Sequence, residues 1–307
     1  MQSLVNPNSY DVEVIGRIAD VPLPNIASSA VLAELSIGAF NPQRTDERVT
    51  EAVHTAEHAA RSSGKYVKRL YADTKQFVQI KTLEMRARHF HRKMTMPWSD
   101  GGQRLLITSL LPEYVTGITE IEQQFWGVVT DIQENYDAIM RYVQYRMGNT
   151  FDATLYPSAD NLPKYFKFHH ARVPVPEVND FDKVASSAQQ IMRDEFAKHL
   201  EHIRNGIVEE VRENTKKVLQ KMSERLDFSG ENGDKKTFKN TLVDNVRDWH
   251  EKMGQFNNVV KLPDIDTLYG QVGGILADSN PEVLRVNADV RRSVKSRVDA
   301  ILTKMDW

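Results

Sequence analysis

The chain has 307 residues, 40% of them hydrophobic and 27% charged, which is the composition of an ordinary water-soluble globular protein. It contains no cysteine, which excludes disulfides, thiolate nucleophiles, iron–sulfur clusters and cysteine zinc sites, and it predicts a reducing, cytoplasmic location. The formal net charge of −2 excludes a global attraction to nucleic acid or anionic lipid, so any such attraction must be local. There is neither a basic leader with an apolar run nor a stretch of 18 apolar residues, so we expect no export and no membrane insertion.

Two short alternating runs near the start, "YDVEVIG" and "VLAELSI", predict strands between turns. A third strand is predicted from "KYFKFHHARV", which lies between proline pairs that exclude a helix interior. We expect these runs to form a small β element from residues 10–40 and 164–175.

Three helices are predicted in the first half of the chain. Apolar positions at helical spacing favour a helix over 45–63, and Thr74 is an acceptable cap for a second helix that runs to about Met94. The most regular pattern runs from Ile118 to Val143, and Gly148 is expected to end that helix because glycine readily takes positive φ.

The longest helical pattern is proline-free and covers residues 184–228. After the polar "SGENGDKK" turn, a heptad series from Phe238 to Val260 follows, so we predict an antiparallel coiled-coil hairpin. A weaker helix over 263–278 and a last helix, capped by Asn280 with Pro281 in its first turn, complete the chain.

The predicted fold class is therefore mainly α, an elongated helical bundle with a long antiparallel coiled-coil hairpin and the small β element. Four parts are expected: an N-terminal β segment (1–41), a helical core with a proline-rich β insertion (42–183), the long hairpin (184–262) and C-terminal helices (263–307).

The segment before the "TMPWSDGG" turn is strongly basic, and the segment after it is strongly acidic. Ten Lys or Arg stand against two acids between Arg61 and Lys93, and seven acids stand against one base between Asp100 and Asp137. If the two flanking helices pack antiparallel, these charges offset each other within the molecule, which we take as the first interpretation. The alternative is a phosphate-binding surface. Its candidate residues are Lys65, Lys68, Arg69, Arg86, Arg88, Arg92 and Lys93.

Other chemistry finds little support in the sequence. Tyr66, Tyr71, Phe77 and Phe90 have basic neighbours suited to base stacking, but their helical spacing suits burial equally well. "HTAEH", with histidines four residues apart, resembles part of a helical metal pair but lacks the acid next to the first histidine. No phosphate-binding loop, dinucleotide fingerprint or nucleophile elbow is present, so nothing in the sequence argues for an enzyme, and we predict no metal and no cofactor. A metal-dependent enzyme that uses His54 and His58 is a third alternative, and it would need a third ligand nearby.

Taken in order, "RARHFHRKMTMPWSDGGQRLL", "MGNTFDATLYPSADNLPKYFKF" and "VPVPEVNDFDKV" resemble the signature stretches of an uncharacterised family of phage and mobile-element proteins. The resemblance covers roughly residues 45–230. It implies no established activity. Members of that family are often encoded beside MoxR-like AAA+ ATPases and von Willebrand A domain proteins, which implies an adaptor role, in the host cytoplasm if the gene is phage-borne.

We therefore predict a non-enzymatic helical scaffold or adaptor with a protein partner, such as an AAA+ ATPase, and nucleic-acid binding as the alternative. If the helix over 238–260 is not covered within its own chain, its apolar seam becomes a partner-binding surface through Trp249 and Phe256. The sequence leaves open whether the chain forms a homo-oligomer.

Overall fold

The computed structural model describes residues 26–71, 74–99, 102–176, 186–226 and 241–305. The chain divides into two compact units. Unit 1 comprises residues 1–32, 95–109 and 172–307, and unit 2 comprises residues 33–94 and 110–171. Two of the four boundaries between the units fall within strands, β1 (Ala30–Gly38) and β6 (Lys167–Pro174), and the other two follow residues 94 and 109.

The predicted fold class is wrong, because two sheets accompany the helices. β4 (Met96–Pro97), β5 (Arg104–Ile107), β1 and β6 form a four-stranded sheet in the order β4-β5-β1-β6, and β2 (Gln43–Thr45) pairs antiparallel with β3 (Val67–Arg69). β1 covers the predicted run at 31–37, and β6 covers the predicted run at 164–173 from Lys167 onward, since the start of that run lies in a 3-10 turn (Leu162–Tyr165). β4 and β5 were not foreseen because each is too short to show alternation. The strand predicted from "YDVEVIG" lies outside the described residues.

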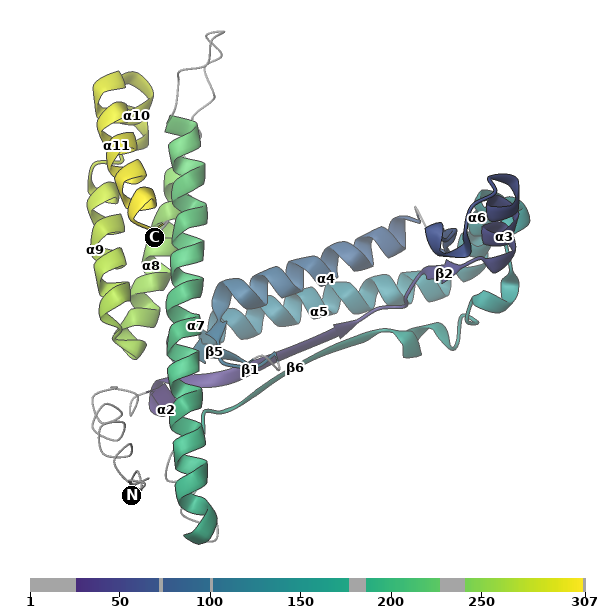
Figure 1. Cartoon of the computed structure of the whole chain (residues 1–307), viewed down its shortest axis with the longest axis horizontal. Helices are drawn as coiled ribbons and strands as arrows, with labels where there is room; N and C mark the ends of the chain where they lie inside the picture. Colours follow the sequence, from purple (N-terminus) through teal and green to yellow (C-terminus); the bar gives the residue numbers. More distant parts are fainter. Residues whose placement is uncertain (1–25, 72–73, 100–101, 177–185, 227–240, 306–307) are drawn as a thin grey trace, which may run out of the picture. The chain divides into compact units, whose positions relative to one another are not determined.

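Unit 2 is organised around α4 (Lys75–Met94) and α5 (Leu111–Glu134), which pack along each other (Figure 1). They are antiparallel: Gln76 near the start of α4 contacts Asp131 near the end of α5, and His91 near the end of α4 contacts Tyr114 near the start of α5. The antiparallel packing that the charge-offset interpretation requires is thus present.

Smaller elements complete unit 2. α3 (Glu47–Ala56) is shorter than predicted and ends before the histidine at position 58, which has a φ of 50°. The helix predicted through Gly148 breaks at Asn135, whose side chain bonds back to Asp131, and α6 (Tyr136–Met147) follows. Gly148 ends α6 with a φ of 50°, as predicted.

Short 3-10 turns (η4, Gly148–Thr150; η5, Ala153–Leu155; η6, Leu162–Tyr165) lead from α6 back to β6. Two more 3-10 turns lie earlier in the chain, η2 (Arg61–Ser63) in unit 2 and η3 (Thr108–Leu110) before α5.

Unit 1 contains α2 (Ile26–Ser29), α7 (Ser186–Leu226), α8 (Thr241–Val260), α9 (Pro263–Ala277), α10 (Pro281–Val286) and α11 (Ala288–Met305). Asn280 caps α10 through the N–H of Glu282, as predicted, but the final helix is divided at Asn287.

The predicted two-helix coiled-coil hairpin is also wrong. α8 packs against both α7 and α9, and α11 packs against α7, so the four helices share one core (Figure 1). The buried positions of α7 explain the difference. From Ile203 to Leu219 they recur at every fourth residue, and each such step turns the buried position by about 40° around the helix. The apolar line therefore winds around α7 and meets several partners, whereas a coiled-coil seam keeps to one side.

Candidate nucleic-acid interface

The outer face of α4 carries a dense row of cations. The helix has 20 residues, so it is about 30 Å long, and its buried positions, such as Ile80, Leu83 and Ala87, face the core of unit 2. All six Lys and Arg residues of the helix are exposed, and Glu84 is its single acid. We call these six residues the basic face of α4: Lys75, Lys81, Arg86, Arg88, Arg92 and Lys93.

Two apolar side chains lie among these cations. Val78 is 56% exposed and Met85 is 58% exposed, seven residues apart and hence on one line of the helix. Lys81 and Arg88 flank this line on one side, and Arg86 flanks it on the other. A polyanion lying along α4 would therefore meet cations on both sides of a narrow apolar ridge.

The acids of α5 do not pair with these bases. α5 carries five acids and no base. Glu122 pairs with His170 of β6 at 3.1 Å, and Asp131 accepts from Gln76 and from Asn135. Charge on the two helices is thus balanced in number, but within the described residues no ion pair joins a base of α4 to an acid of α5.

The basic face makes few contacts of its own. Arg88 pairs with Glu84 at 2.9 Å and donates to the carbonyl of Ile37 at 2.8 Å, while Arg86 donates to Gln124 at 3.0 Å. Lys81 and the two cations at positions 92 and 93 form no ion pair with any described residue. These charges are hydrated, and they can bind an external anion without first breaking an internal contact.

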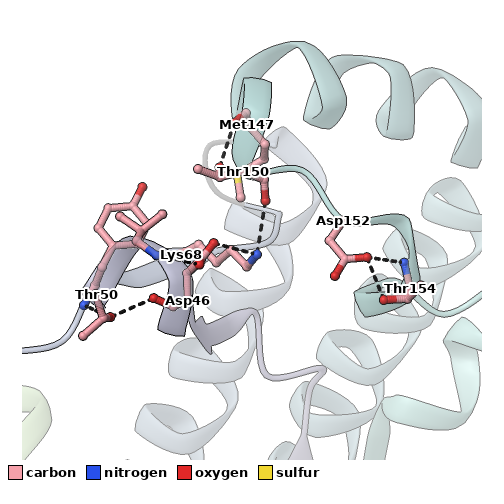
Figure 2. Close-up of polar contacts among 9 residues, drawn as sticks. Asp46, Thr50, Lys68, Met147, Thr150, Asp152 and Thr154 are labelled. Atoms are coloured by element: carbon pink, nitrogen blue, oxygen red, sulfur yellow. Dashed lines mark hydrogen bonds and ion pairs between the residues drawn. The ribbon is translucent and has the colours of Figure 1, made fainter. Parts of the chain in front are cut away.

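Lys68 is placed differently from the other predicted cations, because it is buried. Its Nζ donates to Asp46 Oδ2 and to the carbonyl of Thr150, both at 3.1 Å (Figure 2). Both charged side chains of the pair are at most 9% exposed. Lys68 therefore joins β3 to the start of α3 and to η4, and it cannot reach a phosphate in solution.

Asp46 is the centre of this contact. Its other carboxylate oxygen accepts from the backbone N–H of Val49, so the residue caps α3 while it pairs with Lys68. The Val49 N–H, and after it Lys68, lower the pKa of Asp46. Nearby, the hydroxyl and the N–H of Thr154 lower the pKa of Asp152 in the same way (Figure 2).

Lys65 and Arg69 are exposed on either side of Lys68, before and at the end of β3. Alternation along the strand explains the difference, since Lys68 faces inward and its neighbours face outward. Of the seven predicted residues, five are exposed and form no ion pair with a described residue: Lys65, Arg69, Arg86, Arg92 and Lys93. Arg88 is exposed but pairs with Glu84, and Lys68 is buried in its pair with Asp46.

Most aromatic residues proposed for stacking serve the core. Tyr71 is buried and stacks on Phe77 at 3.9 Å between ring centroids, and Phe90 stacks on Tyr114 at 5.9 Å. Tyr66 is 42% exposed. An outer face of α6 that was not predicted carries Arg141, Tyr142 and Tyr145, all of them exposed. The spacing was a usable signal, because Arg141 and Tyr145 lie on the side of the helix away from Ile139 and Val143.

Neither residue of the alternative partner surface is freely exposed. Phe256 is buried, and Trp249 is half-buried with its indole N–H donating to the hydroxyl of Thr215 on α7 at 2.9 Å. Both side chains therefore contribute to the helical core of unit 1.

The histidines do not assemble a metal site. Among the described residues, no group of three or more His, Asp or Glu side chains is arranged to hold a metal ion. His54 is buried with Nε2 against the carbonyl of Gly64 at 3.0 Å, while His58 lies beyond the end of α3. The helical pair suggested by "HTAEH" thus does not form, because the helix ends first.

Comparisons with protein-family models, with curated proteins and with solved structures found no match. The resemblance to a phage and mobile-element family thus stays a prediction. In the part of the chain that the structure describes, no helix is both long enough and apolar enough to cross a membrane.

Proposed function

We propose that this protein is a non-enzymatic binding protein whose basic face of α4 binds nucleic acid through its phosphates. The observation that carries the proposal is the exposure of six cations along one helix, beside acids that do not pair with them. Each phosphate neutralised by such a cation releases condensed counterions, which is the main source of sequence-independent affinity. A net charge of −2 means that this attraction is local to α4.

The test measures binding of the full chain to fluorescein-labelled 30-nucleotide DNA, single-stranded and duplex, by fluorescence anisotropy at about 100 mM salt. The variant carries Lys81→Glu and Arg92→Glu, two exposed positions without an ion pair among the described residues. We expect its affinity to fall about tenfold or more, since two phosphate contacts become repulsive.

A matched control carries Lys217→Glu and Lys221→Glu on the exposed surface of α7, which changes the net charge equally. Its affinity should stay within about threefold of the original. Absence of binding by the unaltered protein, or equal losses in the two variants, would refute the proposal.

The scaffold or adaptor role is the second candidate. It is favoured by the N-terminal part of α7, where residues 188–202 include no buried side chain and Ile191 is 60% exposed. Affinity capture from the native host with and without nuclease separates the two roles. A nuclease-resistant partner such as an AAA+ ATPase would support the adaptor, and nucleic acid whose removal releases all partners would support the first proposal.

A further inference from the structure

The outer face of α6 presents two tyrosines to solvent. Tyr145 is 84% exposed and Tyr142 is 42% exposed, while Ile139 and Val143 of the same helix are buried. Residues three apart on a helix are surface neighbours, with about 5–6 Å between their Cβ atoms. The two tyrosines therefore occupy adjacent exposed positions of α6, and we call this pair the aromatic platform.

A cation accompanies this platform. Arg141 is exposed, directly before Tyr142 and one helical turn before Tyr145. Proteins that bind single strands combine exposed aromatic rings, on which bases stack, with cations that contact the adjoining phosphates. α6 carries both components within a single turn and a half.

The platform lies in the same unit as the basic face of α4. Gln76 at the start of α4 donates to Asp131 at the end of α5 at 3.1 Å, and α6 begins only five residues later at Tyr136. A nucleic-acid strand that lies along α4 toward the N-terminus of that helix therefore reaches the end of unit 2 that carries α6 (Figure 1).

We infer that the nucleic acid bound by the basic face of α4 is single-stranded and that its bases stack on Tyr142 and Tyr145. This inference rests on the proposed function. Stacking requires bases with an open face, which a duplex provides only at its ends, whereas the phosphates that α4 contacts are present in both forms. The tyrosines thus distinguish single strands from duplexes, whereas the cations contribute affinity for both forms.

The decisive measurement compares the affinity of the full chain for a 30-nucleotide thymidine strand and for a 30-base-pair duplex. In one variant both tyrosines are replaced by alanine (Tyr142→Ala and Tyr145→Ala), and in the other by phenylalanine. Stacking is worth about 1–3 kcal/mol per base, so we expect the alanine variant to lose about tenfold or more in affinity for the single strand. Its duplex affinity should change less than about threefold.

The phenylalanine variant keeps the rings and should bind the single strand within about threefold of the original. It also controls for folding, because its helix content and melting temperature can be compared with those of the alanine variant. Single-strand binding that survives alanine substitution would overturn the inference, as would equal losses for strand and duplex.

The two proposals fail in different ways. If Lys81→Glu with Arg92→Glu weakens binding but the alanine variant does not, the basic face of α4 remains the binding site and the tyrosines have no part in it. If neither oligonucleotide binds the unaltered protein, the proposed function itself fails. If the alanine variant keeps its affinity for the single strand but no longer binds a protein partner, the inference fails and the platform is a protein-binding surface.

Discussion

At the scale of single residues, the contact between Asp46 and Lys68 shows how one lysine in a basic segment becomes structural. Asp46 is held by the Val49 N–H and by Lys68, and both favour its charged form. Removing one member of a buried ion pair leaves the other charge without compensation, so this contact should matter more than its surface counterparts.

We predict that Asp46→Asn destabilises the protein at pH 7 and that the effect depends on pH. Because the folded state lowers the pKa of Asp46, its ionisation stabilises the fold fully above the unfolded-state pKa, near 4, and this contribution is lost as the pH falls through the folded pKa. The urea midpoints of the original and the variant should therefore differ most at neutral pH and converge below about pH 4.

The control for this prediction is Glu51→Gln. Glu51 lies on the same helix and pairs with Arg61, but both side chains are more than half exposed. Surface pairs of this kind contribute about 0–1 kcal/mol. A pH-independent difference for Asp46→Asn, or an equal effect of the two variants, would contradict our account of the Asp46 contact.

A second residue-scale prediction concerns adjacent glutamates on α7. Glu210 accepts a hydrogen bond from Arg104 of β5 at 2.6 Å, with both side chains mostly buried, whereas Glu209 is exposed. Glu210→Gln should lower the free energy of unfolding by about 1–2 kcal/mol, and Glu209→Gln by well under 1. Chemical denaturation of both variants checks this, and equal costs would show that the Arg104 contact is not stabilising.

At the scale of elements, the packing of α4 on α5 depends on a glycine. A Cβ added at Gly117 of α5 would overlap the ring of Phe90 on α4, while a Cβ at Gly127 of the same helix meets nothing. The side chain missing at Gly117 is thus what allows the aromatic ring to lie against the helix.

We expect Gly117→Ala to destabilise the protein by about 1–3 kcal/mol, because the ring and the helix must separate. Gly127→Ala should stabilise it by up to about 1 kcal/mol, since alanine favours the helix and has room there. Thermal unfolding should therefore show a lower melting temperature for Gly117→Ala and a higher one for Gly127→Ala. Stabilisation by both would mean that Phe90 moves aside at little cost.

At the scale of the whole molecule, charge is separated although the total is close to zero. The net charge of the chain is −2, yet α4 has six bases and one acid, whereas α5 has five acids and no base. Binding to a polyanion should therefore depend on the few cations of α4 and not on the charge of the molecule as a whole.

The salt dependence of binding tests this view. For single strands the slope of log affinity against log salt concentration is about −0.7 for each phosphate contacted, so the six cations of α4 together with Arg141 predict a slope no steeper than about −5. Anisotropy titrations between about 50 and 200 mM salt measure it. A much steeper slope would require cations other than Arg141 and the basic face of α4, and a slope near zero would exclude phosphate binding.

Sequence patterns located most helices of the chain. The regular spacing of apolar residues placed α4, α7 and α8 within a few residues, and Asn280 and Gly148 marked a helix start and a helix end correctly. These features depend on hydrogen bonds and side-chain positions within one or two turns, which a local stretch of sequence determines. The absence of cysteine likewise excluded whole classes of chemistry from composition alone.

Only the tertiary structure decided which side chains are accessible and which elements pair. The sequence assigned Lys68 to the same basic surface as Arg69, yet Lys68 is buried against Asp46, a residue 22 positions away. The four-stranded sheet and the shared core of α7, α8, α9 and α11 likewise join segments far apart in the chain. Periodicity shows whether a helix or strand has an apolar or a charged face. Whether another segment covers that face depends on contacts between distant parts of the chain, and these contacts follow from the packing of the whole fold.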